Sequence, residues 1–173
     1  MRFTPPNAPV ETESSAAPDK PTSGPVSAAS LLRDRLFVAA LLIPLPLWAV
    51  WLSITGQPVD LVWPLAQPLR FTMLVLIYPV LEEIVFRGLL QDVLHRVCKS
   101  KTVGPLSLSN VLTSLVFTAT HFLYHAPLWA AAVFVPSLVF GFFKDRHRRL
   151  LSPIVLHIYY NFGYFWLFGS TVS

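Results

Sequence analysis

Residues 71–94 read FTMLVLIYPVLEEIVFRGLLQDVL. This stretch is long and apolar enough to cross a lipid bilayer, which takes roughly 20 residues. It nevertheless carries Glu82, Glu83 and Arg87 in its middle. An ionisable side chain at bilayer depth is costly unless it is paired or hydrated, so such residues usually serve a function. The stretch therefore predicts a transmembrane helix that carries part of a functional site.

The composition of the whole chain favours a membrane protein. Of its 173 residues, 54% are hydrophobic and 13% are charged, whereas a soluble domain carries roughly 25% charged residues. The mean hydropathy is +0.57. These values exclude an ordinary cytosolic globule and a wholly disordered chain. The single cysteine, Cys98, allows neither an internal disulfide nor a paired-cysteine metal site.

Four other apolar stretches accompany the first, at residues 36–54, 110–124, 128–143 and 150–168. We therefore expect an all-α fold, a polytopic membrane helix bundle of about five transmembrane helices, within residues 31–173. Residues 1–30 are rich in Pro, Ser and Ala and lack an apolar run, so they are predicted to form a disordered tail.

The basic residues indicate how the bundle is oriented. In a five-span arrangement, eleven of the 13 lysines and arginines fall on one side of the membrane. By the positive-inside rule, that side and the N-terminus are cytoplasmic. The net charge of +4 thus reports topology, and no nucleic-acid partner is expected. The eleven are Arg2, Lys20, Arg33, Arg35, Arg96, Lys99, Lys101, Lys144, Arg146, Arg148 and Arg149.

Polar residues on three of the predicted spans converge at one depth. Glu82, His121 and Asn161 each lie roughly 15–16 Å from the cytoplasmic end of their span at 1.5 Å per residue. His157 precedes Asn161 by four residues, so both share one helix face. The sequence therefore predicts one site that contains a carboxylate, two imidazoles and a carboxamide.

These groups suit the hydrolysis of a peptide bond by an activated water. Glu83 and Arg87 are four residues apart and can pair, which leaves Glu82 as a general base beside His121. His157 and Asn161 could donate hydrogen bonds to the oxyanion. No covalent intermediate, cofactor or metal is required.

Two alternatives remain open. The polar residues could be structural ion pairs in a non-catalytic membrane scaffold. A zinc enzyme could use His121, His157 and Glu82 as ligands. His121 and His125 also have the spacing of a zinc-binding helix, but Phe122 stands where such a helix carries its glutamate.

Three motifs together resemble one known family. They are Glu-Glu-x-x-x-Arg at 82–87, Phe-x-x-x-His at 117–121 and His-x-x-x-Asn at 157–161. In this order they are similar to the motifs of the CAAX protease and bacteriocin-processing (CPBP) family, which includes the type II CAAX prenyl endopeptidases. The resemblance implies a glutamate-dependent intramembrane protease with its core at about 71–168. It assigns catalytic roles to Glu82, His121, His157 and Asn161, and supporting roles to Glu83, Arg87 and Phe117.

The resemblance also sets expectations about substrate and location. Family members often have more spans, so this chain looks like a minimal core whose groove a partner subunit or an oligomer could complete. The expected substrate is a membrane-associated or secreted protein or peptide, processed at a CAAX-type or C-terminal sorting signal. The expected location is a bacterial inner membrane. Bacteriocin immunity without catalysis is the alternative for this family.

Overall fold

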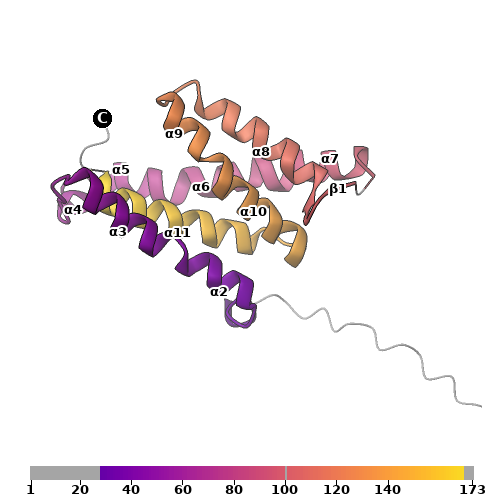
Figure 1. Cartoon of the computed structure of the whole chain (residues 1–173), viewed down its shortest axis with the longest axis horizontal. Coiled ribbons are helices and arrows are strands. Elements are labelled where there is room, and N and C mark those ends of the chain that lie inside the picture. The colour runs from indigo at the N-terminus through magenta and orange to yellow at the C-terminus, as the bar shows by residue number, and fades with distance from the viewer. Residues whose placement is uncertain (1–27, 100, 170–173) are drawn as a thin grey trace, which may run out of the picture.

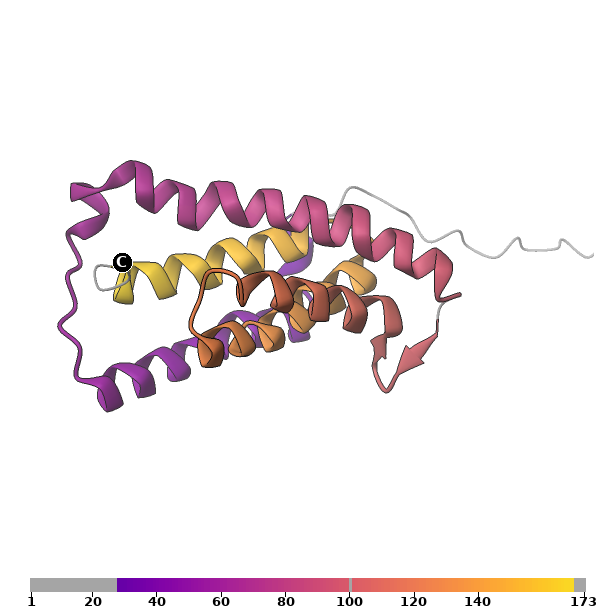
Figure 2. The ribbon, with the colours of Figure 1, turned by 90° about the horizontal axis from the view of Figure 1, so that it is seen from above.

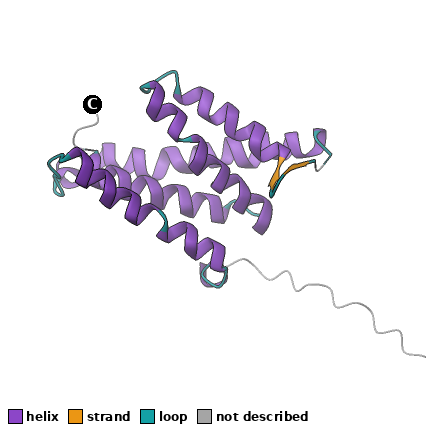
Figure 3. Ribbon diagram, viewed as in Figure 1, coloured by secondary structure: helices purple, strands orange, loops and turns teal. Residues whose placement is uncertain are grey.

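The computed structural model describes residues 28–99 and 101–169 and is almost entirely helical (Figure 3). Most of the predicted tail, residues 1–27, lies outside the described residues, and the first helix starts at Ala28. The elements along the chain are α1 Ala28–Leu31, α2 Arg35–Leu42, α3 Pro44–Thr55, α4 Trp63–Ala66, α5 Pro68–Thr72, η1 Met73–Ile77, α6 Tyr78–Glu83, η2 Ile84–Leu90, α7 Gln91–Val97, β1 Thr102–Val103, β2 Leu106–Ser107, α8 Leu108–His121, α9 Pro127–Ala132, α10 Phe134–His147 and α11 Leu151–Phe168.

The helices form an elongated bundle with α11 in the middle (Figures 1 and 2). Segments α5 to α7 follow one another as one long helix. Helix α11 packs against the η1 and α6 segments of this long helix, and it also packs against α10, α2 and α3. Helices α8, α9 and α10 form a hairpin, and α8 packs against α7 and α10. A short antiparallel pair of strands, β1 and β2, connects α7 to α8. The all-α class predicted from the sequence is confirmed.

Local sequence signals explain where several helices begin and end. The Asp34 side chain accepts a hydrogen bond from the backbone of Leu36 and so caps α2. Helix α3 begins at Pro44, whose missing N–H is tolerated in a first helical turn. It ends at Gly56, which has a φ of 58°, a conformation that glycine adopts without a steric penalty. The apolar stretch is thus divided into α2 and α3 at Pro44.

Segments α5 to α7 form one continuous helix that contains two π-helical stretches, η1 and η2. In η1 the amide of Tyr78 bonds to the carbonyl of Met73, five residues earlier. The next amide in that register would belong to residue 79, which is a proline without an N–H. The carbonyl of Leu74 instead accepts a hydrogen bond from the Asn161 side chain, 2.9 Å away. Such π-helical turns are frequent at functional sites.

A hydrophobic cluster holds α2 to the bundle. Phe37 and Ala40 of α2 pack with Phe140 and Phe143 of α10 and with Leu156 of α11. All five are at least 95% buried. This cluster fixes α2 against the helices that carry the predicted site.

A second contact region between α7, α8 and α10 is polar. The Gln91 amide donates to the carbonyl of Gly141 and to the carboxylate of Asp145. The Asn110 amide donates to the carbonyl of Leu138. A side chain at Gly141 would overlap the Asn110 carboxamide, so only glycine allows this close approach. These hydrogen bonds give the amide groups of Gln91 and Asn110 acceptors within the bundle, as an apolar surrounding requires.

Within the described residues, two helical segments are long and apolar enough to cross a membrane, Arg35–Thr55 and Pro127–His147. The other three predicted spans are shorter or less apolar than these two segments. Helix α8 has only 14 residues. The long helix α5–α7 contains the two glutamates, and α11 contains His157 and Asn161. The outer faces expose large apolar side chains, for example Leu128 at 84% and Ile54 at 76%. Such surfaces are typical of lipid contact.

Candidate functional site

A buried ion pair forms the floor of the site. Glu83 and Arg87 are fully buried, and Arg87 Nε lies 3.5 Å from Glu83 Oε2. Arg87 Nη2 also donates to the carbonyl and to the hydroxyl of Ser137, at 2.9 and 2.8 Å. The guanidinium lies 5.1 Å from the centre of the Phe117 ring, in the range of a cation–π contact. The pair predicted from the i, i+4 spacing is confirmed.

His157 connects the two glutamates. Its Nδ1 lies 2.8 Å from Glu83 Oε1, so this nitrogen donates to the carboxylate. Its Nε2 lies 3.5 Å from Glu82 Oε2, at the outer limit of a direct hydrogen bond. The imidazole stacks on Phe140 with ring centres 4.7 Å apart. Because one nitrogen and one face are fixed, the second nitrogen is directed towards Glu82.

The two glutamates occupy different surroundings although they are adjacent in sequence. Glu83 has no exposed surface and bonds to His157 and Arg87. The Glu82 side chain keeps 33% of its surface exposed and lines a cavity between the helices. The sequence indicated that Glu82 would lack the arginine partner, and it gave no sign that His157 would lie beside both carboxylates.

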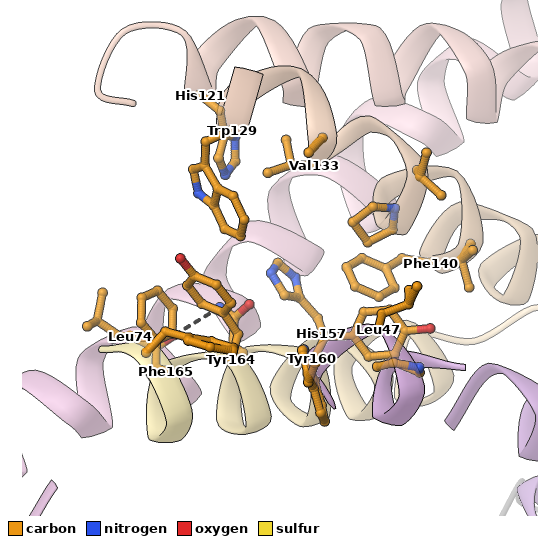
Figure 4. Close-up of a pocket in the computed structure, with 18 of the residues that line it drawn as sticks. Leu47, Leu74, His121, Trp129, Val133, Phe140, His157, Tyr160, Tyr164 and Phe165 are labelled. Carbon is orange, nitrogen blue, oxygen red and sulfur yellow. Dashed lines mark hydrogen bonds between the residues drawn. The ribbon is translucent and has the colours of Figure 1, made fainter. Parts of the chain in front are cut away.

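His121 lies on α8 at the opposite wall of the same cavity. Its Nδ1 is 2.9 Å from the carbonyl of Phe117, one turn earlier, so Nδ1 carries the proton in the neutral ring. The Nε2 atom then remains an acceptor. Figure 4 shows the rings of His121 and His157 pointing into one space from opposite sides. His125 stacks on His121, with ring centres 5.6 Å apart.

Asn161 lies one turn beyond His157 on α11 and lines the same cavity. One of its two amide hydrogens is used by the carbonyl of Leu74, as described above. A carboxamide has two N–H donors, so one remains for another acceptor. The structure thus brings Glu82, His121, His157 and Asn161 to one cavity, and it places Glu83 and Arg87 beneath it.

The cavity has a volume of about 570 Å³. Glu82 and three histidines line it, whereas most of its wall is apolar and aromatic. Figure 4 shows His121 and His157 among these aromatic side chains. Helices α2 and α3 supply part of the apolar wall, and Trp129 of α9 stacks on Tyr164 of α11 with ring centres 4.5 Å apart. A cavity of this size and character suits an apolar chain with one polar linkage.

Two further residues contribute to the candidate site and were not predicted from the sequence. Ser137 holds Arg87 through two hydrogen bonds, and it is the single hydroxyl residue in the apolar stretch 128–143, which could have drawn attention to it. Tyr160 lines the cavity and donates to the carbonyl of Ala40, 2.8 Å away, thereby linking α11 to α2. No pattern in the sequence marked Tyr160, because it lies within a run of apolar and aromatic residues.

The described residues contain no group of three or more His, Cys, Asp and Glu side chains that could hold a metal ion. The ligand set of the zinc alternative, His121, His157 and Glu82, is therefore not assembled in this arrangement.

Two of the described helical segments are long and apolar enough to cross a membrane. The sequence model of the Rce1-like family, type II CAAX prenyl endopeptidases, matches residues 64–163. The chain belongs to this family, a family of membrane proteases, and the resemblance seen in the three motifs is confirmed. The matched range contains all three motifs and leaves α2 and α3 outside.

A curated relative is an uncharacterized 24.3 kDa protein from Escherichia coli. It is 35% identical over 81 residues, which are 46% of this chain and 35% of the relative. The chain thus matches about a third of that protein's length. No solved structure matches the chain.

Proposed function

We propose that this protein is an intramembrane endopeptidase that hydrolyses a peptide bond with a water activated by Glu82. The observation that carries the proposal is the different placement of the two glutamates. Glu82 faces an apolar cavity shared with His121, His157 and Asn161, whereas Glu83 is sealed beneath it. A carboxylate at the wall of such a cavity suits a general base.

In the proposed reaction, a water binds between the Glu82 carboxylate and the free Nε2 of His121. Glu82 takes one proton from the water while the water oxygen attacks the carbonyl carbon of the substrate. The water's new bond to carbon turns the carbonyl oxygen into an oxyanion. Glu82 then returns the proton to the amide nitrogen, the carbon–nitrogen bond breaks, and an amine and a carboxylic acid leave.

The oxyanion needs hydrogen-bond donors, which His157 and Asn161 are placed to supply. Protonated His157 can donate from Nε2, because its Nδ1 is held by Glu83. Asn161 can donate the amide hydrogen that the carbonyl of Leu74 does not use. Removing one donor of this kind costs roughly 100- to 1,000-fold in kcat in other proteases.

The supporting residues act through these groups. Glu83 orients the His157 ring, and Arg87 balances the buried charge of Glu83. Phe117 contacts Arg87 with its ring and holds His121 with its backbone carbonyl. They are positioning residues: Glu83 and Arg87 do not line the cavity, and Phe117, which does, acts through its contacts with Arg87 and His121.

We further propose a five-span, multi-pass protein of a bacterial inner membrane with a cytoplasmic N-terminus, formed by residues 31–173 behind a tail at 1–30. The site would lie near the middle of the membrane on three of these spans. The substrate would be a membrane-associated or secreted protein or peptide with an apolar group beside the scissile bond. The open wall of the cavity leaves room for an oligomer or a partner subunit.

The test is proteolysis by the purified full chain in detergent. The substrates are membrane-derived and secreted peptides together with a prenylated peptide. We expect the wild type to cleave and His121→Ala not to cleave, because the water would lose its contact with Nε2 of His121. Asp60→Asn is the control, since Asp60 accepts hydrogen bonds from the amides of Val62 and Trp63 at the start of α4 and does not line the cavity.

Equal cleavage by His121→Ala and Asp60→Asn would contradict the proposal. A folded wild type that cleaves no peptide, while a partner protein still binds it, would favour the non-catalytic scaffold.

A further inference from the structure

An open, basic hollow lies at the end of the bundle where α2 begins and α10 ends. Helix α2 starts at Arg35, α10 ends at His147, and the two ends meet through Asp34. The hollow shares no residue with the Glu82 cavity. Its lining residues are Arg33, Asp34, Arg35, Leu36, Arg146 and His147.

The one acid of the hollow is already neutralised. Asp34 accepts hydrogen bonds from the guanidinium of Arg146 and lies 3.0 Å from Nε2 of His147. The hydrogen bond from Arg146 lowers the pKa of Asp34 to about 2, so the carboxylate stays charged and occupied. Arg33 and Arg35 are exposed, and no acid pairs with either of them within residues 28–99 and 101–169.

The other acids on this side of the bundle are occupied as well. Asp92 pairs with Lys144, and Asp145 accepts hydrogen bonds from Gln91 and Ser107. The hollow therefore presents an excess of positive charge that the described part of the chain does not balance. An anion is the complementary ligand.

The position of the hollow points to a lipid as the source of that anion. Both membrane-length segments end there: one begins at Arg35 and the other ends at His147. These ends lie at the level of the headgroups if the segments span the bilayer. On the cytoplasmic side, basic residues next to a span attract anionic lipids.

An apolar strip continues from the hollow along α2. Leu36 and Ala39 of α2 and Ile43 just after it follow one another at three- or four-residue steps, so they share one helix face, and all three are exposed. Leu36 also lines the hollow. A charged hollow joined to an exposed apolar strip matches an amphiphile, with a charged head and an apolar chain, better than it matches a free ion.

We propose that this hollow binds the phosphodiester headgroup of an anionic phospholipid, with an acyl chain along the strip on α2. Arg33 and Arg35 would contact the phosphate oxygens, while Asp34 holds Arg146 at the rim. Because α2 forms part of the wall of the Glu82 cavity through Ala40, a bound lipid would also hold that wall in place.

The test is a thermal-unfolding titration of the full chain in phosphatidylcholine micelles with increasing phosphatidylglycerol. A ligand that binds the folded state raises the Tm as its concentration rises. We expect such a rise for the wild type, and an apparent affinity about twenty-five-fold weaker for Arg33→Gln/Arg35→Gln, at about five-fold per cationic side chain removed. Arg96→Gln/Lys99→Gln, which removes two basic residues elsewhere, should keep the wild-type response.

Two further arms keep the result interpretable. Arg33→Lys/Arg35→Lys retains both charges and should retain most of the response, which separates charge from folding defects. Inorganic phosphate replaces phosphatidylglycerol in the second arm and should give no rise. An equal response of both glutamine double variants, or an equal rise with inorganic phosphate, would overturn the proposal. The readout does not involve proteolysis, so it is independent of the proposed activity.

Discussion

Removing the charge of Arg87 should destabilise the protein far more than removing a partly exposed charge. Arg87 and Glu83 are both fully buried, and Arg87 also supplies two hydrogen bonds to Ser137. Arg87→Met keeps the length of the side chain and leaves the Glu83 carboxylate without its cation. Breaking a buried pair in this way costs about 3–5 kcal/mol.

The assay is unfolding of the purified protein in detergent, measured for the two single variants and the double variant. Glu83→Gln and Arg87→Met are each expected to lower the free energy of unfolding. The double variant should fall short of their sum by about 2 kcal/mol, because neither charge then remains unpaired. Lys144→Met is the matched control: its partner Asp92 is 44% exposed, so its loss should cost at most about 1 kcal/mol.

Two results would refute this reasoning. One is a double variant whose loss in the free energy of unfolding equals the sum of the two single losses, which would mean that the two charges do not stabilise each other. The other is an Arg87→Met variant that loses no more stability than Lys144→Met, which would mean that the interior is hydrated enough to support an isolated carboxylate.

Three other predictions follow from particular contacts. Gly163→Ala should lower the free energy of unfolding by about 1–3 kcal/mol, because a methyl group there overlaps the Trp48 ring. Gly88→Ala should cost less, because its methyl group meets the flexible Leu150 side chain at 3.1 Å. A larger loss of Tm in Gly88→Ala than in Gly163→Ala would contradict this packing. The pKa of Asp34 is lowered from 3.8 to about 2, chiefly by its hydrogen bond with Arg146, so its contribution to stability is complete above about pH 4 and is lost as the pH falls towards 2; Asp34→Asn should lack this loss in acid unfolding curves. Thorough chelation should leave peptide cleavage unchanged, whereas cleavage that stops on chelation and returns with zinc would support the zinc alternative.

The positions of the helices were largely predictable from the sequence. Hydrophobic length and charge alone located the last predicted span at 150–168, and the structure has α11 at Leu151–Phe168. The third predicted span at 110–124 corresponds to α8 at Leu108–His121. The π-helical turns were not predictable, because hydrophobic periodicity over one turn does not reveal an extra residue; the signal lay in Pro79, whose missing N–H matters only once the helix register is known.

The sequence indicated which polar residues lie close together in the candidate site, but it did not indicate most of the contacts between them. Glu83 and Arg87 pair as their spacing indicated, since that contact is local. The contacts of His157 with both glutamates join residues more than 70 positions apart, and their geometry depends on how α11 packs against α6. The bond from Asn161 to Leu74 arose in the same way.

The most direct test of the central claim is the cleavage rate of Glu82→Gln relative to wild type under single-turnover conditions. This change preserves the shape of the side chain and removes the base, and general-base catalysis contributes roughly 100- to 10,000-fold. We expect a loss of at least about 100-fold, with the Tm unchanged and with Asp60→Asn as active as the wild type. A Glu82→Gln protein that cleaves as fast as the wild type would contradict the account, because another group would then have to activate the water.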